Sequence, residues 1–217
     1  MTKGKTRRRD PRTDATRVAL IEAAETLFAE YGFGGVSLRQ IGLAIGSSNK
    51  TVVAYHFGTK EALIQAIYMH RLPAIDSRRK ELLSAAQAEG RVIDVDALLE
   101  ITWLPLFEQV NDAKCHSYGR FLSAMMREGH ANSRMLVNDQ FPTSLLVWNM
   151  VVELLGLEPS AELYEGMYLA ATIVLESLTY IDRREAMKAE SKSDRQIFEN
   201  AVAMSRAALL EAARHLA

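Results

Sequence analysis

The sequence has very little cysteine, and its one thiol, Cys115, cannot form an internal disulfide. A lone cysteine suits a reducing compartment, where it usually serves as a small buried apolar side chain. Apolar runs long enough to span a membrane are also lacking. The basic N-terminus, MTKGKTRRRDPRTD, lacks the apolar stretch of a secretory signal. These absences predict a cytoplasmic protein without a disulfide framework.

Motifs of the common enzyme classes are lacking as well. The sequence contains no G-x-S-x-G elbow, no phosphate-cradling glycine loop and no H-E-x-x-H pair. Its five histidines never recur at the spacing of metal ligands. We therefore expect a protein that is not an enzyme and that uses no metal or cofactor.

The charge that is present lies unevenly along the chain. Residues 1–65 contain ten Lys and Arg against six Asp and Glu, whereas residues 66–217 contain sixteen against twenty-one. Six of the ten cations fall within the first dozen residues. A basic end suits a polyanion, and the neutral-to-acidic remainder then has a different task.

Strand-like alternation is scarce, and apolar residues recur at intervals of three and four along nearly the whole chain. The first helix is expected from about Asp14 to Tyr31, ended by Gly32, because glycine readily adopts the left-handed cap conformation. Beyond Pro73 the expected helices are longer: 74–88, 95–109, 114–127, 138–155, 160–188 and 194–216. The fold class is all-α, with about nine helices: an N-terminal helix-turn-helix module followed by a larger helical body.

The segment after the first helix predicts a short helix with a strong start signal. Ser37 and Gln40 form an S-x-x-Q capping box, and Val36 and Ile41 fit a hydrophobic staple around it. This helix is expected to stop at Gly46.

A third helix is expected to be capped by Ser47 or Ser48 and to run to about Phe57. One half of its helical wheel is expected to pack inward, and it contains Val52, Val53, His56 and Phe57. The other half is polar and short, and it contains Lys50, Thr51, Ala54 and Tyr55. Two short helices that meet at a glycine, the second with a polar face, indicate a helix-turn-helix.

A fourth helix is expected to begin at Lys60 with Thr59 as its cap. Its free N–H groups and positive dipole end, beside the ammonium of Lys60, predict a phosphate site. A phosphate bound there would position the preceding helix on DNA.

At this point the chain resembles a known family. The run from Thr16 to Ile67, with AAETLFAEYGFGGVSLRQIGLAIG followed by YHFGTKEAL, resembles the DNA-binding domain of TetR-family transcriptional regulators. The resemblance covers about the first third of the chain. It implies a basic arm over 1–13, a DNA-binding domain over 14–58, and an effector-binding and dimerisation domain over 59–217.

The residues expected to contact DNA lie in the arm and around the helix-turn-helix. They are Arg7, Arg8, Arg9, Ser37, Arg39, Ser47, Ser48, Asn49, Lys50, Thr51, Tyr55, His56, Thr59 and Lys60. The step from Gly46 to Phe57 is one residue longer than the family's common pattern, so the usual tyrosine aligns with Ala54 and Tyr55 is displaced by one. Either the turn absorbs the extra residue or the helix starts one residue later.

For the body, the resemblance implies a homodimer in which the last two helices of each subunit form a four-helix bundle. The expected interface is Met167, Ala171, Leu175, Leu178, Ile197, Ala201, Met204 and Ala208. It also implies a cavity for a small apolar or aromatic effector, lined by Trp103, Phe107, Tyr118, Phe121, Met125, Trp148 and Tyr168. His116, Arg120 and Asn149 are candidate polar contacts to that effector.

The sequence thus predicts a homodimeric, ligand-responsive repressor that binds a pseudo-palindromic site on double-stranded DNA. Two alternatives remain open. The first is a DNA-binding regulator without an effector. The second is a helical small-molecule-binding protein or enzyme whose N-terminal module only resembles a DNA reader.

Overall fold

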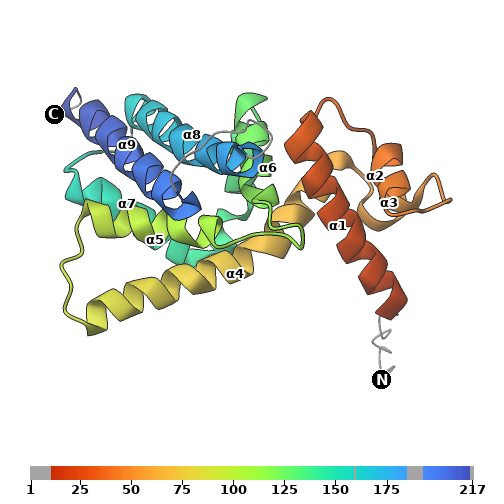
Figure 1. Ribbon diagram of the computed structural model, residues 1–217, viewed down its shortest axis with the longest axis horizontal. Coiled ribbons are helices and arrows are strands. Elements are labelled where there is room, and N and C mark those ends of the chain that lie inside the picture. The colour runs from red at the N-terminus through yellow and green to blue at the C-terminus, as the bar shows by residue number, and fades with distance from the viewer. Residues whose placement is uncertain (1–10, 159, 185–192, 216–217) are drawn as a thin grey trace, which may run out of the picture.

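The computed structural model describes residues 11–158, 160–184 and 193–215, and this part of the chain is helical, without a strand (Figure 1). The expected all-α class is confirmed. The α-helices are α1 (Pro11–Tyr31), α2 (Leu38–Ala44), α3 (Val52–Phe57), α4 (Lys60–Ala88), α5 (Val95–Phe107), α6 (Ser117–Arg127), α7 (Pro142–Leu154), α8 (Ala161–Arg183) and α9 (Asp194–Arg214). A 3₁₀ helix, η1 (Ala131–Gln140), precedes α7.

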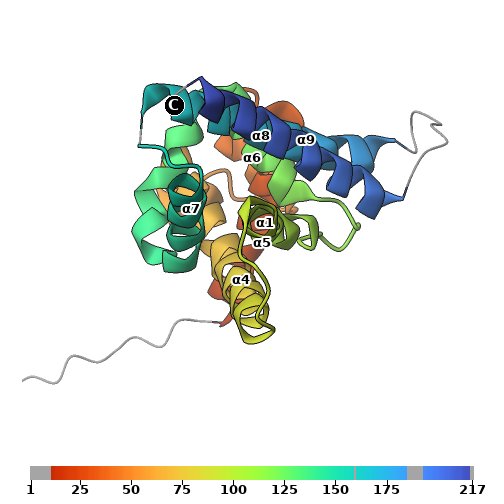
Figure 2. The same cartoon turned by 90° about the vertical axis from the view of Figure 1, so that its left-hand side faces the viewer.

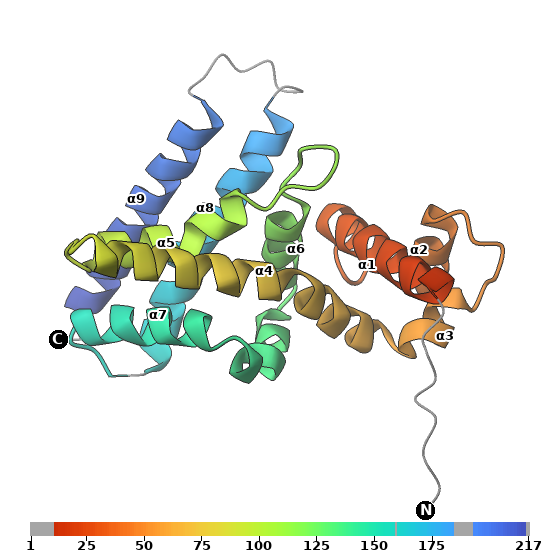
Figure 3. The same ribbon diagram turned by 90° about the horizontal axis from the view of Figure 1, so that it is seen from below.

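The helices form two parts joined by α4. The head consists of α1, α2, α3 and the start of α4, and it lies at the opposite end of the molecule from the C-terminus (Figure 1). Figure 3 shows α4 running from the head along the whole length of the body. Figure 2 views the body end on, with α8 and α9 side by side above α7, α5 and α4. A single helix therefore belongs to both parts.

The expected break at Pro73 is wrong, because α4 continues through this proline over 29 residues. A proline inside a helix removes one hydrogen bond and crowds the preceding turn. Here Pro73 itself is exposed, while Leu72 and Ile75 on either side are buried. Their burial in the core offsets the local cost and keeps the helix continuous.

Two further helix starts differ from expectation. α6 begins at Ser117 rather than near residue 114, because Lys114 has a φ of 61°, which is outside the helical region. α7 begins at Pro142, where proline is favoured in the first turn, and the residues before it form η1. α1 begins at Pro11, so the last residues assigned to the basic arm are helical.

One continuous core joins the head to the body. Phe28 of α1 lies 6.3 Å from Phe121 of α6 between ring centroids, and Tyr68 of α4 lies 5.6 Å from Phe121. Tyr118 and Met125 belong to the same cluster. Tyr118, Phe121 and Met125 are each at most 1% exposed, so they are core residues rather than the walls of an open effector cavity.

Several residues expected at a dimer interface are also buried within one subunit. Leu175, Leu178 and Ala201 have exposed fractions of 2%, 0% and 6%. Met167 and Ile197 pack against the hydrophobic clusters of the body, and Ala171 and Ala208 are half-buried. Their assignment to the interface is wrong for the buried three, because this side of α8 and α9 faces the body. Met204 is the exposed member of the set, at 62%.

The Tyr118 hydroxyl has no hydrogen-bond partner among the described residues, although Tyr118 is buried. Because an unpaired buried hydroxyl is costly, Tyr118→Phe is expected to raise the free energy of unfolding by about 1 kcal/mol, measured by urea denaturation. Burial also raises the pKa of Tyr118, so in wild type the unfolded chain ionises first. Wild type should therefore lose stability above about pH 10 that the variant keeps.

Tyr68→Phe is the matched control for this prediction. Its hydroxyl lies 2.9 Å from the Ser133 hydroxyl, so its removal breaks a buried hydrogen bond. We expect Tyr68→Phe to destabilise the protein. The interpretation of Tyr118 is wrong if both variants shift stability in the same direction.

Candidate functional site

The start of α2 is built as the sequence predicts. The Ser37 hydroxyl accepts a hydrogen bond from the backbone N–H of Gln40, and the Gln40 side chain accepts one from the backbone N–H of Ser37. Val36 and Ile41 are buried on either side of the cap. The capping box and the flanking apolar pair therefore fix the angle at which α2 enters the head.

The turn between α2 and α3 is longer than expected. Gly46 has a φ of 72° and Ser47 donates its N–H to the Gly42 carbonyl, so α2 ends in a left-handed turn. The Asn49 side-chain oxygen then accepts hydrogen bonds from the N–H and the hydroxyl of Thr51, at 3.0 and 2.9 Å. α3 begins only at Val52.

The expected cap at Ser47 or Ser48 is therefore wrong, and Thr51 occupies the cap position without a side-chain cap bond. The hydrogen bonds of Asn49 stabilise the turn, which absorbs the additional residue. The turn is therefore longer than expected, and α3 also starts later, at Val52. Lys50 and Thr51 lie in the turn before α3, not on its helical face.

Within α3 itself, the buried and exposed residues alternate as predicted, although Lys50 and Thr51 of the predicted outer half precede the helix. Val52 and Val53 are buried, whereas Ala54 is exposed and Tyr55 is 79% exposed. Lys50 and Thr51 are exposed beside them. The outer edge of the helix-turn-helix thus offers an ammonium, a hydroxyl and a phenol around a small alanine.

A cation that the sequence did not predict, Arg17 of α1, lies at the C-terminal end of α3. The Arg17 guanidinium of α1 lies 4.9 Å from the centroid of the Phe57 ring. His56 is half-buried, and burial followed by the charge of Arg17 lowers its pKa. Arg17 could not be found from its position in α1, because only the packing of α1 on α3 brings it there.

The ammonium of Lys60 contacts Phe33, in the loop between α1 and α2. It donates to the Phe33 carbonyl at 2.5 Å and lies 4.3 Å from the centroid of the Phe33 ring. Thr59 caps α4 as expected, because its hydroxyl accepts the N–H of Ala62 at 3.1 Å. Lys60 thus supports the α1–α2 loop in this structure, and its contact to phosphate stays a prediction.

The remaining predicted DNA contacts differ in their exposure and in whether the described part of the chain includes them. Arg39 is exposed on α2. Arg7, Arg8 and Arg9 lie outside the described residues. The Ser37 hydroxyl is used as the N-cap of α2, where it accepts the N–H of Gln40. Arg39, Lys50, Thr51 and Tyr55 are each exposed on the head.

Polar contacts across the seam between head and body were not foreseen. The carboxylate of Glu25 in α1 is fully buried and accepts hydrogen bonds from Arg71 of α4 and Ser117 of α6. At the end of α6, the Glu128 carboxylate accepts the N–H groups of Phe33 and Gly34, each at 2.9 Å. α6 therefore holds α1 and the loop that follows it.

Two of the candidate polar contacts to the effector have partners of their own, Arg120 at the seam and His116 within the body. Arg120 pairs with Glu30 of α1, and the His116 ring lies 2.7 Å from Asp182 of α8. These two side chains therefore hold elements together, which corrects their expected role as effector contacts.

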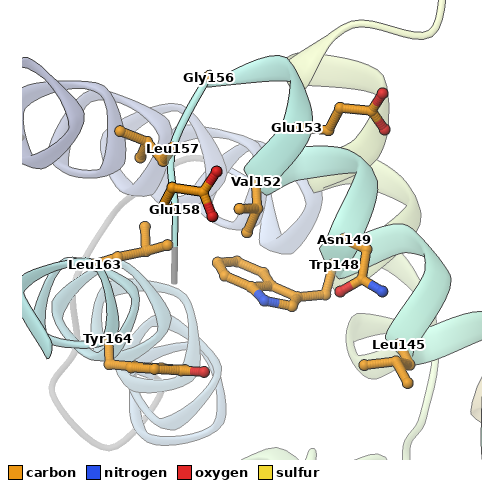
Figure 4. Close-up of a pocket in the computed structure, with 10 residues that line it drawn as sticks. All are labelled: Leu145, Trp148, Asn149, Val152, Glu153, Gly156, Leu157, Glu158, Leu163 and Tyr164. Carbon is orange, nitrogen blue, oxygen red and sulfur yellow. The ribbon is translucent and has the colours of Figure 1, made fainter. Parts of the chain in front are cut away.

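The body contains a cavity of about 600 Å³ between the end of α7 and the start of α8 (Figure 4). Trp148 and Asn149 line it, together with Val152, Leu163 and Tyr164. Trp148 is the one member of the expected aromatic set that lines this cavity. Trp103 packs against all three hydrophobic clusters, Phe107 stacks on Phe198, and the Tyr168 hydroxyl donates to the Met126 carbonyl. Most residues of the expected cavity wall therefore do not line this cavity.

Comparisons with known proteins agree with the geometry of the head. Residues 20–67 match the family model of bacterial regulatory proteins of the tetR family. This confirms the resemblance for that segment, which runs from the middle of α1 into α4. No curated protein sequence matches the chain significantly.

Among solved structures, the chain is similar to that of a TetR-family transcriptional regulator from Mesorhizobium loti MAFF303099. The two share 18% sequence identity, with 92% of this chain and 98% of the other covered and a TM-score of 0.49. Among the described residues, no helix has both the length and the apolar character needed to cross a membrane.

Proposed function

We propose that the chain is a transcriptional regulator that reads the major groove of DNA with the turn 46–51 and α3. The supporting observation is the exposed edge of Lys50, Thr51 and Tyr55, held outward by the burial of Val52 and Val53. This edge lies within the segment that matches the tetR family. Ammonium and hydroxyl groups at this position suit base edges and phosphates.

Contacts to the DNA backbone complete the proposed interface. Arg39 lies in the first turn of α2, and Thr59 is the N-cap of α4. Arg17 of α1 adds a cation at the C-terminal end of α3. Arg7, Arg8 and Arg9 would follow the backbone or enter a minor groove. In this proposal residues 14–58 form the reading domain, and residues 59–217 form the domain for dimerisation and effector binding.

The proposal includes a homodimer formed through the outer faces of α8 and α9. Tyr168 and Leu169 of α8 are exposed, as are Ala203, Met204 and Ala207 of α9. Small alanines allow two helices to approach closely, and the large apolar side chains supply buried area. This outer face replaces the buried residues expected from the sequence.

The proposal further includes repression that a small-molecule effector relieves. α4 extends from the head into the body, and Glu25, Arg71 and Ser117 join three helices at the seam. A change in the body would therefore move the head and alter the separation of the two reading heads in the dimer. If a saturating effector leaves DNA affinity unchanged, this part of the proposal is wrong.

Selection of bound sequences from random duplex DNA tests DNA reading and should recover a palindrome. On that duplex, the Lys50→Ala and Tyr55→Ala variants are each expected to lose affinity by about 10- to 100-fold, or about 1–3 kcal/mol. Lys50→Ala should also reduce the dependence of affinity on salt by about one phosphate contact. Fluorescence anisotropy measures both.

Lys80→Ala is the matched control, because Lys80 is exposed on α4 in the body. It is expected to bind the duplex like wild type. Unchanged binding by both head variants, or no duplex binding by wild type, would rule out the proposed reading surface.

A further inference from the structure

The cavity between α7 and α8 has an apolar, aromatic floor. Trp148 and Val152 of α7 face Leu163 and Tyr164 of α8 across it (Figure 4). Its volume of about 600 Å³ lies in the range of sites that hold small organic molecules. The floor would therefore bind a flat or branched apolar group.

The rim of the cavity is acidic. Glu153 and Glu158 line it, and no Lys, Arg or His does. Both glutamates are exposed, and neither side chain pairs with another described residue. The surrounding sequence is also acidic: residues 135–182 contain seven Asp and Glu and no Lys, Arg or His. Glu153 and Glu158 thus place negative charge at the cavity, and no cation stands among the lining residues.

The helix ends at the cavity, like its acidic rim, favour a positively charged ligand. α7 ends here, and the end of a helix carries partial negative charge. α8 begins here, but its positive end already has internal partners. The Ser160 hydroxyl accepts the N–H of Leu163, and the Glu162 carboxylate, whose pKa its own backbone N–H and the Ser160 hydroxyl lower, lies in the first turn. An anion therefore gains little at this place.

We propose that this cavity binds a small lipophilic cation, an aromatic or branched apolar group with one quaternary or protonated centre, and that this cation is the effector. The Trp148 indole binds the cation through its ring face. Glu153 and Glu158 supply the compensating charge at the rim. The effector role rests on the proposed function, whereas the binding of the cation does not.

The test uses two ions of the same shape and opposite charge, tetraphenylphosphonium and tetraphenylborate. The chain has two tryptophans, so the Trp103→Phe variant reports on Trp148 alone. Tetraphenylphosphonium is expected to quench this fluorescence saturably and to bind at least about tenfold more tightly than tetraphenylborate. Equal binding of the two ions would overturn the proposal. Equilibrium dialysis of wild type repeats the comparison without the Trp103 change.

Glu153→Gln/Glu158→Gln removes the charge of the rim and keeps its shape. This variant is expected to bind tetraphenylphosphonium about tenfold more weakly than its parent. Glu165→Gln is the matched control, since Glu165 is exposed on α8 but does not line the cavity. Unchanged binding in the double variant, or an equal loss in the control, would overturn the assignment of the site.

A separate measurement addresses the effector role. Tetraphenylphosphonium is added to the complex of wild type with its selected duplex, and anisotropy follows release of the DNA. Release by wild type and not by Glu153→Gln/Glu158→Gln is the expected result. Saturable binding of the cation without release would overturn the effector role while the binding site stands. Failure to bind any duplex would instead contradict the proposed function.

Discussion

Replacing Arg71 by methionine is expected to lower the free energy of unfolding by about 3–5 kcal/mol. The Glu25 carboxylate is fully buried in α1, and Arg71 donates two hydrogen bonds to it, at 2.7 and 3.1 Å. Without the guanidinium, a buried carboxylate keeps only the Ser117 hydroxyl as a partner. The Glu25 carboxylate cannot reach water. The folded state therefore loses most of the interactions that offset the cost of burying this charge.

Urea denaturation measures this loss, and Arg78→Met is the matched control in the same helix. Arg78 pairs with Glu108 at 2.8 Å, but both side chains are about two-fifths exposed. An exposed ion pair contributes about 0–1 kcal/mol, so the control should cost far less. Equal losses in the two variants would show that Glu25 and Arg71 do not form a specially important buried pair.

The double variant Glu25→Leu/Arg71→Met separates the charge from the packing. It removes both charges, so it is expected to be more stable than Arg71→Met alone. If the double variant is less stable than the single one, burial of the lone carboxylate is not the cause of the loss.

Replacing Leu169 by lysine is expected to weaken the proposed dimer by about a thousandfold. A charge in the centre of an interface costs about 2 kcal/mol or more, and two-fold symmetry introduces it twice. A total of about 4 kcal/mol corresponds to that factor in the dissociation constant. Leu169 is 60% exposed in one subunit, so its substitution should leave the fold of the subunit intact.

Sedimentation across a concentration series measures the dimer, and anisotropy measures its binding to the selected duplex. A monomer contacts only half of a palindrome, so affinity should fall together with dimerisation. Leu136→Lys is the control, because Leu136 is 65% exposed on η1, away from α8 and α9. A dimer that persists in Leu169→Lys, or one that dissociates equally in both variants, would rule out the outer face as the interface.

Features that depend on a few neighbouring residues could be predicted. The capping box of Ser37 and Gln40 and the cap at Thr59 each involve groups within four residues of one another. The inward side of α3 was also predictable, because Val52 and Val53 recur with the helical period. Such features identify a helix-turn-helix before any tertiary contact is known.

Features that depend on competition between local and distant contacts could not be predicted. Pro73 was expected to end a helix, but buried Leu72 and Ile75 hold α4 continuous. Ser47 and Ser48 were plausible caps, yet the side chain of Asn49 stabilises a longer turn. The Lys60 ammonium was expected beside a phosphate at the start of α4, and in the structure it donates to the Phe33 carbonyl.

By itself, the sequence determined the helical class, the position of the reading head and its resemblance to one family. The helical class and the position of the head follow from periodicity and from short-range hydrogen bonds, whereas the resemblance rests on the motif residues between Thr16 and Ile67. Only the tertiary structure decided which side of α8 faces inward, where the acidic cavity lies, and that Glu25 meets Ser117 across 92 residues. Burial and charge compensation depend on which distant surfaces meet, and the period of a single helix does not specify its partner.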